Sequence, residues 1–336
     1  MLAGATRCLG AVPSIYGFAI LSLGQVLAAI AQGFMLAVPP QLASAWFPET
    51  EVNLATSLAV SANNLGVAIG CVWTPLVVKA PTMHQDIPRL LFLQALICVI
   101  AFILIWASFK REPPFCEKLA IKDAASKEQS KQIWRQRSFH CMMLSYGIVM
   151  GAQCAIITLL AQILLPPFRQ RIDESFVGYL GFAMLVIGLP ASILAGFYLD
   201  RTLQYRSVCL VFFAATFLSV AGLYIATEVR YLPGVTASCI LFGFSSYAIA
   251  PAIFQYASEM YYPVSEIIPT GYLLTSGNAW GVLLVFLMGW SEDTSDSFSM
   301  RIPLICLVII SFGGLYSMAK VKGQLKRLEA LRSKPL

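Results

Sequence analysis

The chain has 336 residues, of which 58% are hydrophobic and only 12% are charged. Ordinary soluble domains carry roughly 25% charged residues, so a water-soluble fold of this length has no means of hiding so much apolar surface. The mean hydropathy of +0.74 instead indicates a polytopic membrane protein whose side chains mostly face lipid. The net charge of +6 does not predict nucleic-acid binding, because much of the positive charge is concentrated in two segments beside apolar runs.

Nine segments are long and apolar enough to cross a membrane as helices, which need about 20 residues each. In chain order they are residues 14–38, 54–78, 87–109, 139–165, 176–199, 208–226, 233–256, 268–290 and 302–318. One long charged connection at 111–137 separates the first three segments from the last six. The sequence therefore predicts an all-α protein with two helical bundles.

Positive charge gives the expected orientation. Eight Lys and Arg lie in 110–137 and six in 320–334, and an excess of Lys and Arg marks the cytoplasmic side of a membrane protein. We expect a multi-pass protein of the plasma membrane with a cytoplasmic central loop and C-terminus. The predicted domains are a partial N-terminal bundle (1–109), a cytoplasmic linker (110–137), a six-helix bundle (138–319) and a cytoplasmic tail (320–336).

Many transporters are built from two six-helix units. Three segments followed by six correspond to half of the first unit and the whole of the second. Residues 1–10 contain a single charge, Arg7, and no cleavage pattern of a secretory signal. We therefore expect about three helices to be missing before the first full segment, with Met1–Gly10 as the end of the third.

A short motif closes the second helix of the second half. Gly196, Asp200 and Arg201 have the spacing G-x-x-x-D-R, which resembles the loop motif of major facilitator transporters. Glycine allows two helix ends to approach closely, an aspartate accepts hydrogen bonds from a neighbouring helix N-terminus, and arginine anchors the loop inside. The alternative is an ordinary charged turn. Its position between the second and third helices of a half favours a role in gating.

Residues along most of the chain resemble one branch of that family, the feline leukaemia virus subgroup C receptor-related transporters (solute carrier family 49). The similar stretches are Gly24-Gln25, Pro39-Pro40-Gln41-Leu42-Ala43, Trp46-Phe47-Pro48, Asn64-Leu65-Gly66, Ser145-Tyr146-Gly147-Ile148 and Tyr262-Pro263-Val264. The resemblance implies a major facilitator fold with a truncated N-terminal half and a complete C-terminal half, working by alternating access. It also implies an organic substrate, either a choline- or ethanolamine-like cation or a haem-like amphiphile.

The sequence departs from that pattern where the relatives recognise choline. Gln153 and Cys154 occupy a stretch where the relatives carry aromatic residues, and aromatic faces are what bind a quaternary amine. Asn278 lies near a position where the relatives resemble a sequence with a glutamine. Gln255 lies where the relatives resemble a sequence with a glutamate. These departures weaken the case for choline without removing it.

Polar residues at membrane depth are the candidates for contact with a solute, because each is costly against lipid unless it has a partner. The candidates are Gln25, Gln32, Asn63, Asn64, Tyr146, Gln153, Gln162, Gln255 and Asn278. For each amide alone, hydrogen bonding between helices is the more common role, worth about 1 kcal/mol. Glu259 lies near the cytoplasmic end of the seventh segment, just past residue 256, and it is the acid chosen as the candidate for proton coupling.

Small residues also recur four apart, at Gly66/Gly70, Gly147/Gly151 and Gly277/Gly281. This spacing allows close contact between helix backbones, where transporter helices can rock. Static packing is the equally weighted alternative.

Enzymes and metal proteins fit poorly. The nine cysteines have no metal-ligand spacing, and there are only two histidines, so we expect no catalytic residues, metal or cofactor. We predict a secondary transporter with a small-molecule solute and the lipid bilayer as its partners. The alternative is a truncated isoform that binds other membrane proteins and transports nothing. Substrate, coupling ion and oligomeric state are not predicted.

Overall fold

The computed structural model describes residues 2–10, 16–46, 52–79, 82–108, 133–168, 171–202, 204–262, 264, 267–291, 300–323 and 325–326. Every regular element in these residues is a helix, which confirms the all-α fold class. The chain divides into two compact units, Met1–Ile121 and Lys122–Leu336. Their boundary falls inside the linker predicted at 110–137, most of which lies outside the described residues, so the predicted domain limits stay predictions.

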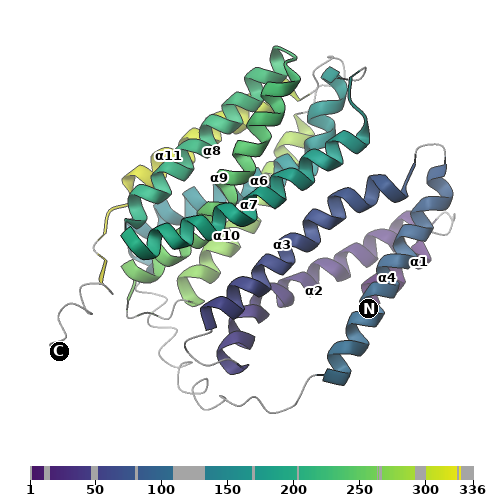
Figure 1. Cartoon of the computed structure of the whole chain (residues 1–336), viewed down its shortest axis with the longest axis horizontal. Coiled ribbons are helices and arrows are strands. Elements are labelled where there is room, and N and C mark those ends of the chain that lie inside the picture. The colour runs from purple at the N-terminus through teal and green to yellow at the C-terminus, as the bar shows by residue number, and fades with distance from the viewer. Residues whose placement is uncertain are drawn as a thin grey trace. The chain divides into compact units, whose positions relative to one another are not determined.

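The first unit contains α1 (Leu2–Gly10), α2 (Gly17–Trp46), α3 (Val52–Val77) and α4 (Met83–Ser108). Helix α1 packs against α2 and α4, and α2 also packs against α3 (Figure 1, purple to blue). Helix α1 occupies the residues predicted to end a further helix. Helix α2 continues beyond its predicted end at residue 38, through two prolines of the kind that membrane helices tolerate when neighbours satisfy the freed backbone groups.

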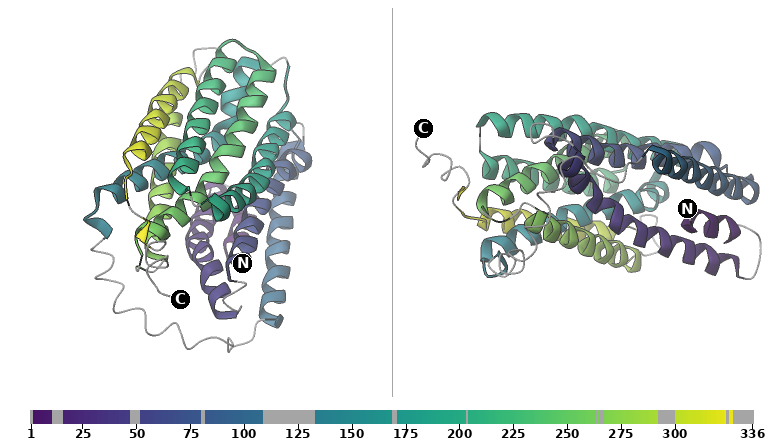
Figure 2. Two further views of the ribbon diagram at one scale, coloured as in Figure 1. Left: turned by 60° about the vertical axis from the view of Figure 1, so that its left-hand side comes forward. Right: turned by 90° about the horizontal axis from the view of Figure 1, so that it is seen from below.

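The second unit contains six long helices, of which five form a closed ring of neighbours and α10 packs mainly against α6. The six helices are α6 (Arg137–Phe168), α7 (Glu174–Thr202), α8 (Tyr205–Glu228), α9 (Leu232–Met260), α10 (Ile267–Trp290) and α11 (Arg301–Lys320). Helix α6 packs against α10 and α11, α11 against α8, α8 against α9, and α9 against α7. Smaller contacts of α6 with α7 close the ring (Figures 1 and 2, teal to yellow).

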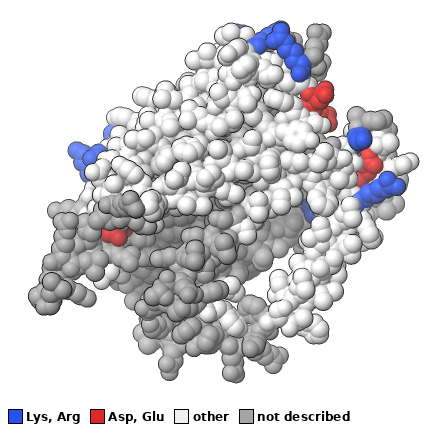
Figure 3. Space-filling view, in the orientation of Figure 1, with Lys and Arg blue, Asp and Glu red and all other residues white. Residues whose placement is uncertain are grey.

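Hydropathy and charge agree with a membrane protein. Of the helices in the described residues, seven are long and apolar enough to span a membrane, namely α4 and the six of the second unit. Shorter apolar stretches remain in α2 and α3. Most of the Lys, Arg, Asp and Glu visible in Figure 3 lie towards the ends of helices, and the described surface between them carries few charges. The prediction of a multi-pass membrane protein is confirmed.

Glycine explains why α6 and α10 lie so close together. A Cβ atom added at Gly151 would lie 2.8 Å from the backbone carbonyl carbon of Trp280, and one added at Gly277 would lie 2.8 Å from Cγ of Met150. Both predicted Gly-x-x-x-Gly pairs of this unit therefore face the same interface, each packing against the opposite helix. The Gly66/Gly70 pair of α3 has no described atom within 4 Å of either added Cβ.

Hydroxyl groups add hydrogen bonds between these helices. Ser276 of α10 donates to the carbonyl oxygen of Met143 on α6 (2.9 Å), and Ser317 of α11 donates to that of Cys141 on α6 (3.1 Å). Thr216 of α8 donates to Ser245 of α9 (2.9 Å). Such bonds stabilise membrane bundles by roughly 0.6 kcal/mol each. Helix α6 is thus fixed on two sides, which positions the residues it carries.

Candidate functional site

Tyr146 and Gln153 lie on the inward face of α6. They are 2% and 6% exposed, and residues seven apart share one face of a helix. The Tyr146 ring lies 5.3 Å from the ring of Phe254 on α9. A Cβ at Gly277 of α10 would be 3.4 Å from the same ring. Three helices of the second unit therefore meet at Tyr146.

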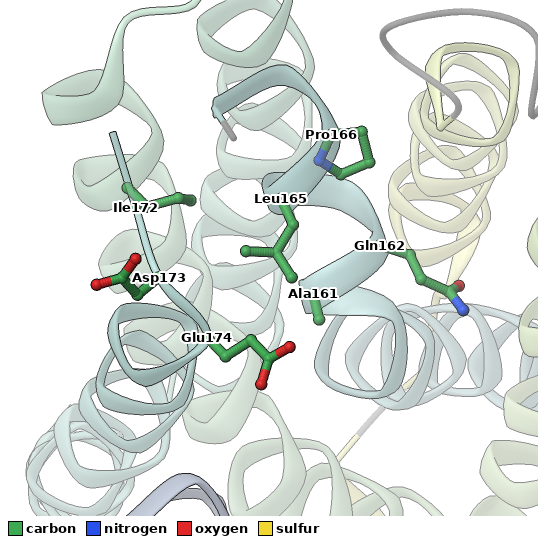
Figure 4. A pocket seen from close by; sticks show the side chains of 7 residues that line it. All are labelled: Ala161, Gln162, Leu165, Pro166, Ile172, Asp173 and Glu174. Atoms are coloured by element: carbon green, nitrogen blue, oxygen red, sulfur yellow. The ribbon is translucent and has the colours of Figure 1, made fainter. Parts of the chain in front are cut away.

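Gln162 lies on the other side of α6. It follows Gln153 by nine residues, or two and a half turns, and it is exposed where Gln153 is buried. Gln162 lines an open cavity of about 460 Å³ at the turn between α6 and α7, together with Asp173 and Glu174. In Figure 4, Gln162 and Asp173 point to opposite sides and Glu174 lies between them. Acidic side chains at the start of α7 also interact favourably with its helix dipole. Their presence is therefore explained without a ligand, and the cavity alone does not define a site.

Gln255 and Asn278 are exposed on α9 and α10. Each directly follows a residue that faces Tyr146, namely Phe254 and Gly277. Neighbouring side chains on a helix point about 100° apart, so these two amides are turned away from the Tyr146 ring. The structure does not gather the predicted polar residues of the second unit into one cluster.

The predicted residues of the first unit are more exposed. Gln25 and Gln32 are both exposed on α2, as expected for residues seven apart on one face. Asn63 is exposed on α3, and the side chain of Asn64 lies outside the described ones.

Arg7, which the sequence analysis noted only as the single charge of residues 1–10, lies next to Gln25. Arg7 of α1 donates from Nη1 to Oε1 of Gln25 (3.1 Å) and from Nη2 to Oε1 of Gln94 on α4 (3.3 Å). Gln94 was not among the predicted site residues, although an amide inside the apolar run of residues 90–105 was a signal of the same kind as the others.

The predicted gating and coupling residues lie at helix ends. Asp200 and Arg201 are in the last turn of α7, and their side chains are outside the described ones. No described atom lies within 4 Å of a Cβ added at Gly196, so the close approach predicted there stays a prediction. Glu259 is partly buried next to the last residue of α9. Among the described residues, no group of three His, Cys, Asp or Glu side chains is placed to hold a metal ion.

Comparison with solved structures supports the architecture. The structure of the fucose transporter FucP in its outward conformation superposes with a TM-score of 0.60 at 14% identity, covering 94% of this chain and 80% of that one. A bacterial homologue of the iron transporter ferroportin in the outward-facing state gives a TM-score of 0.58, also at 14% identity, covering 95% of this chain and 80% of that one. At this identity the likeness concerns the fold alone.

Relatives found by sequence share a higher identity with this chain than these solved structures do. The choline/ethanolamine transporter FLVCR1 of Mus musculus is 29% identical over 357 residues, covering 97% of this chain and 63% of the relative. The choline/ethanolamine transporter FLVCR2 of Rattus norvegicus is 27% identical, with 98% and 63% covered. The chain thus spans less than two thirds of the length of these relatives, and the predicted resemblance to this branch is confirmed. Residues 1–282 match the family model described as Major Facilitator Superfamily, and the chain belongs to that superfamily.

Proposed function

We propose that this protein is a secondary transporter that moves a small organic solute across a membrane by alternating access. The observation that carries the proposal is the family match over residues 1–282, which includes α1–α4 and most of the six-helix unit. Transporters of this kind are built from helical units that rock around a central site. The superfamily is one of transporters, which agrees with the prediction that the chain is not an enzyme.

The solute class we propose is a choline- or ethanolamine-like cation or a haem-like amphiphile. The cation is suggested by the printed names of the relatives FLVCR1 and FLVCR2. Tyr146 and Gln153 are our first choice for solute contacts in the second unit, because they share the inward face of the doubly anchored α6. Asp200 and Arg201 would hold the cytoplasmic gate, and Glu259 would carry the coupling proton.

The membrane address and orientation belong to the same proposal. The proposed address is the plasma membrane, and the two basic segments support a central loop and C-terminus in the cytoplasm. None of the comparisons favours the alternative of a non-transporting interaction partner.

Uptake of labelled choline, ethanolamine and haem by cells expressing the chain tests the function. We expect at least one solute to enter above the level of mock cells, and Tyr146→Ala to abolish that uptake while Tyr146→Phe retains much of it. Leu144→Ala is the matched control, since Leu144 is 40% exposed on the same helix. If the chain reaches the surface and none of the three solutes enters, the proposed solute class is wrong.

A further inference from the structure

Arg7 brings a positive charge into the packing of three helices of the first unit. The guanidinium of Arg7 on α1 is hydrogen-bonded to Gln25 of α2 and Gln94 of α4. Gln25 is the ninth residue of α2, and Gln94 lies nine residues after the start of the α4 span at Gln85. At 1.5 Å per residue, both amides are roughly 12–14 Å from those helix ends. In a hydrocarbon core about 30 Å thick, this is close to the middle.

Close helix packing fixes the arginine in this position. A Cβ added at Gly24 would lie 2.6 Å from Cγ of Arg7, so the absence of a side chain there leaves room for the arginine stem. A Cβ at Gly10 would lie 2.8 Å from the carbonyl oxygen of Gly17, and one at Gly4 would be 3.4 Å from Ala95. These contacts hold α1 against both α2 and α4 and direct the guanidinium towards the two amides.

The cluster offers only donors and positive charge to a ligand. Gln25 and Gln94 both use their carbonyl oxygens on Arg7, which leaves their NH₂ groups to donate. The Nε of Arg7 is buried without a hydrogen-bond partner, and no carboxylate of the described residues lies within 4 Å of the guanidinium. A charge at this depth is costly when it has no counter-charge, and neutral amides do not supply one.

We propose that Arg7, Gln25 and Gln94 bind the carboxylate or phosphate group of the transported solute. The inference rests on the proposed transport function and narrows its substrate class to anionic or zwitterionic organic compounds. A simple cation such as choline has no group that this cluster stabilises, because positive charges repel and its hydroxyl is a weak acceptor. Gln25 is exposed and Arg7 is partly exposed, so a ligand can reach the cluster. At this depth, a solute is a better source of the anion than a lipid headgroup.

The test compares ligands that share a trimethylammonium group. Choline carries a hydroxyl, betaine a carboxylate and phosphocholine a phosphate. Binding is measured by calorimetry on the purified full chain in phosphatidylcholine nanodiscs. We expect betaine or phosphocholine to bind roughly tenfold or more tightly than choline, the size of one charge-assisted hydrogen bond. Arg7→Gln should remove that preference.

Because Arg7→Gln removes contacts that join three helices, a second pair of variants keeps the test decisive. Gln25→Glu and Gln94→Glu each give Arg7 an internal carboxylate, so both should fold and lose the preference for anionic ligands. Gln85→Glu is the matched control on α4, nine residues before Gln94, and should retain the preference. Preserved preference in Gln25→Glu and Gln94→Glu would overturn the proposal.

Three further outcomes separate the site from the function. Choline binding as tightly as betaine and phosphocholine overturns the anion site and leaves the transport proposal standing. Failure of all three ligands to bind also overturns the site, and the uptake screen then judges transport on its own. If phosphatidylglycerol in the nanodisc abolishes the Arg7-dependent preference, the anion is a lipid headgroup and the solute assignment is wrong.

Discussion

The two units of the molecule join their helices by different means. In the second unit, α6 and α10 meet through paired glycines and the uncharged hydrogen bond from Ser276 to Met143. In the first unit, α1 meets α2 and α4 through glycines as well, but the polar contact there is the full charge of Arg7.

Packing alone explains the α6–α10 contact of the second unit. It does not explain the contact of α1 with α2 and α4 in the first unit. A hydroxyl that reaches a backbone carbonyl satisfies both groups at little desolvation cost, whereas a guanidinium between two neutral amides remains a net charge. The difference teaches that the α6–α10 junction satisfies its polar groups internally, while the guanidinium of the α1–α2–α4 junction has no carboxylate partner among the described residues. Four substitutions test this contrast.

The largest effect should come from overpacking the complete junction. In Gly151→Leu, the new side chain collides with the Trp280 backbone, which lies 2.8 Å from the first added carbon. We expect a loss of about 3 kcal/mol or more in the free energy of unfolding, seen as a large fall in apparent Tm by tryptophan fluorescence. Gly313→Leu on α11, where no described atom is within 4 Å of the Cβ, should fold normally. Equal losses in both variants would show that α6 and α10 are not in close contact.

The next effect concerns the charged junction. Gly24→Ala places a Cβ 2.6 Å from Cγ and 2.9 Å from the backbone nitrogen of Arg7. Although alanine favours helix by up to about 1 kcal/mol, we expect a net loss of about 1 kcal/mol as α1 moves away. Gly70→Ala on α3 is the control, because its Cβ meets no described atom within 4 Å. A Gly24→Ala protein as stable as Gly70→Ala would contradict the described position of α1.

A smaller effect should follow removal of the uncharged hydrogen bond. Ser276→Ala deletes the 2.9 Å bond to the Met143 carbonyl, and we expect a loss of about 0.6 kcal/mol. Ser258→Ala removes a hydroxyl that bonds only within its own helix, to Phe254 (3.0 Å), and should cost less. Thermal unfolding of the two variants in the same detergent measures the difference, and a reversed order would show that Ser276 does not join α10 to α6.

The smallest effect should come from a surface ion pair of the second unit. Arg301 of α11 pairs with Glu228 at the end of α8, with side chains 49% and 32% exposed. At this exposure a salt bridge is worth less than about 0.5 kcal/mol, so Glu228→Gln should barely change the apparent Tm. About 1 M salt should reduce even that difference. A shift comparable to that of Gly151→Leu would mean that charge, and not close packing, holds this unit together.

Most of the fold was predictable because hydropathy and segment length determine where membrane helices lie. The nine predicted segments all correspond to helices, and α10 differs from its prediction by one residue at its start. The end of α2 was missed because Pro39 and Pro40 are strong turn signals in water, whereas a membrane helix can continue through them. The two Gly-x-x-x-Gly pairs of the second unit were found from spacing alone, but only the structure shows that they face each other.

The candidate site was less predictable. Sequence patterns identify polar residues at membrane depth, but they do not show which face of a bundle each one occupies. Gln153 and Gln162 look equivalent in the sequence. They lie on opposite faces of α6, however, so Gln153 is buried and Gln162 is exposed. Arg7 was not among the predicted site residues, and its two amide partners are 18 and 87 positions distant. Contacts over such separations follow from tertiary packing.

The contact between the start of α6 and the end of α11 has a consequence for biosynthesis. Ser138 donates to the carbonyl oxygen of Lys322 across 184 positions (2.7 Å), and Arg206 of α8 donates to that of Ala319 (2.9 Å). At roughly 5–20 residues per second, the ribosome finishes α11 about 8 to 30 seconds after it finishes α6. For much of that interval α6 lacks the packing partners that α10 and α11 provide in the finished fold. The packing of α6 is therefore completed only after the last helix has been synthesised.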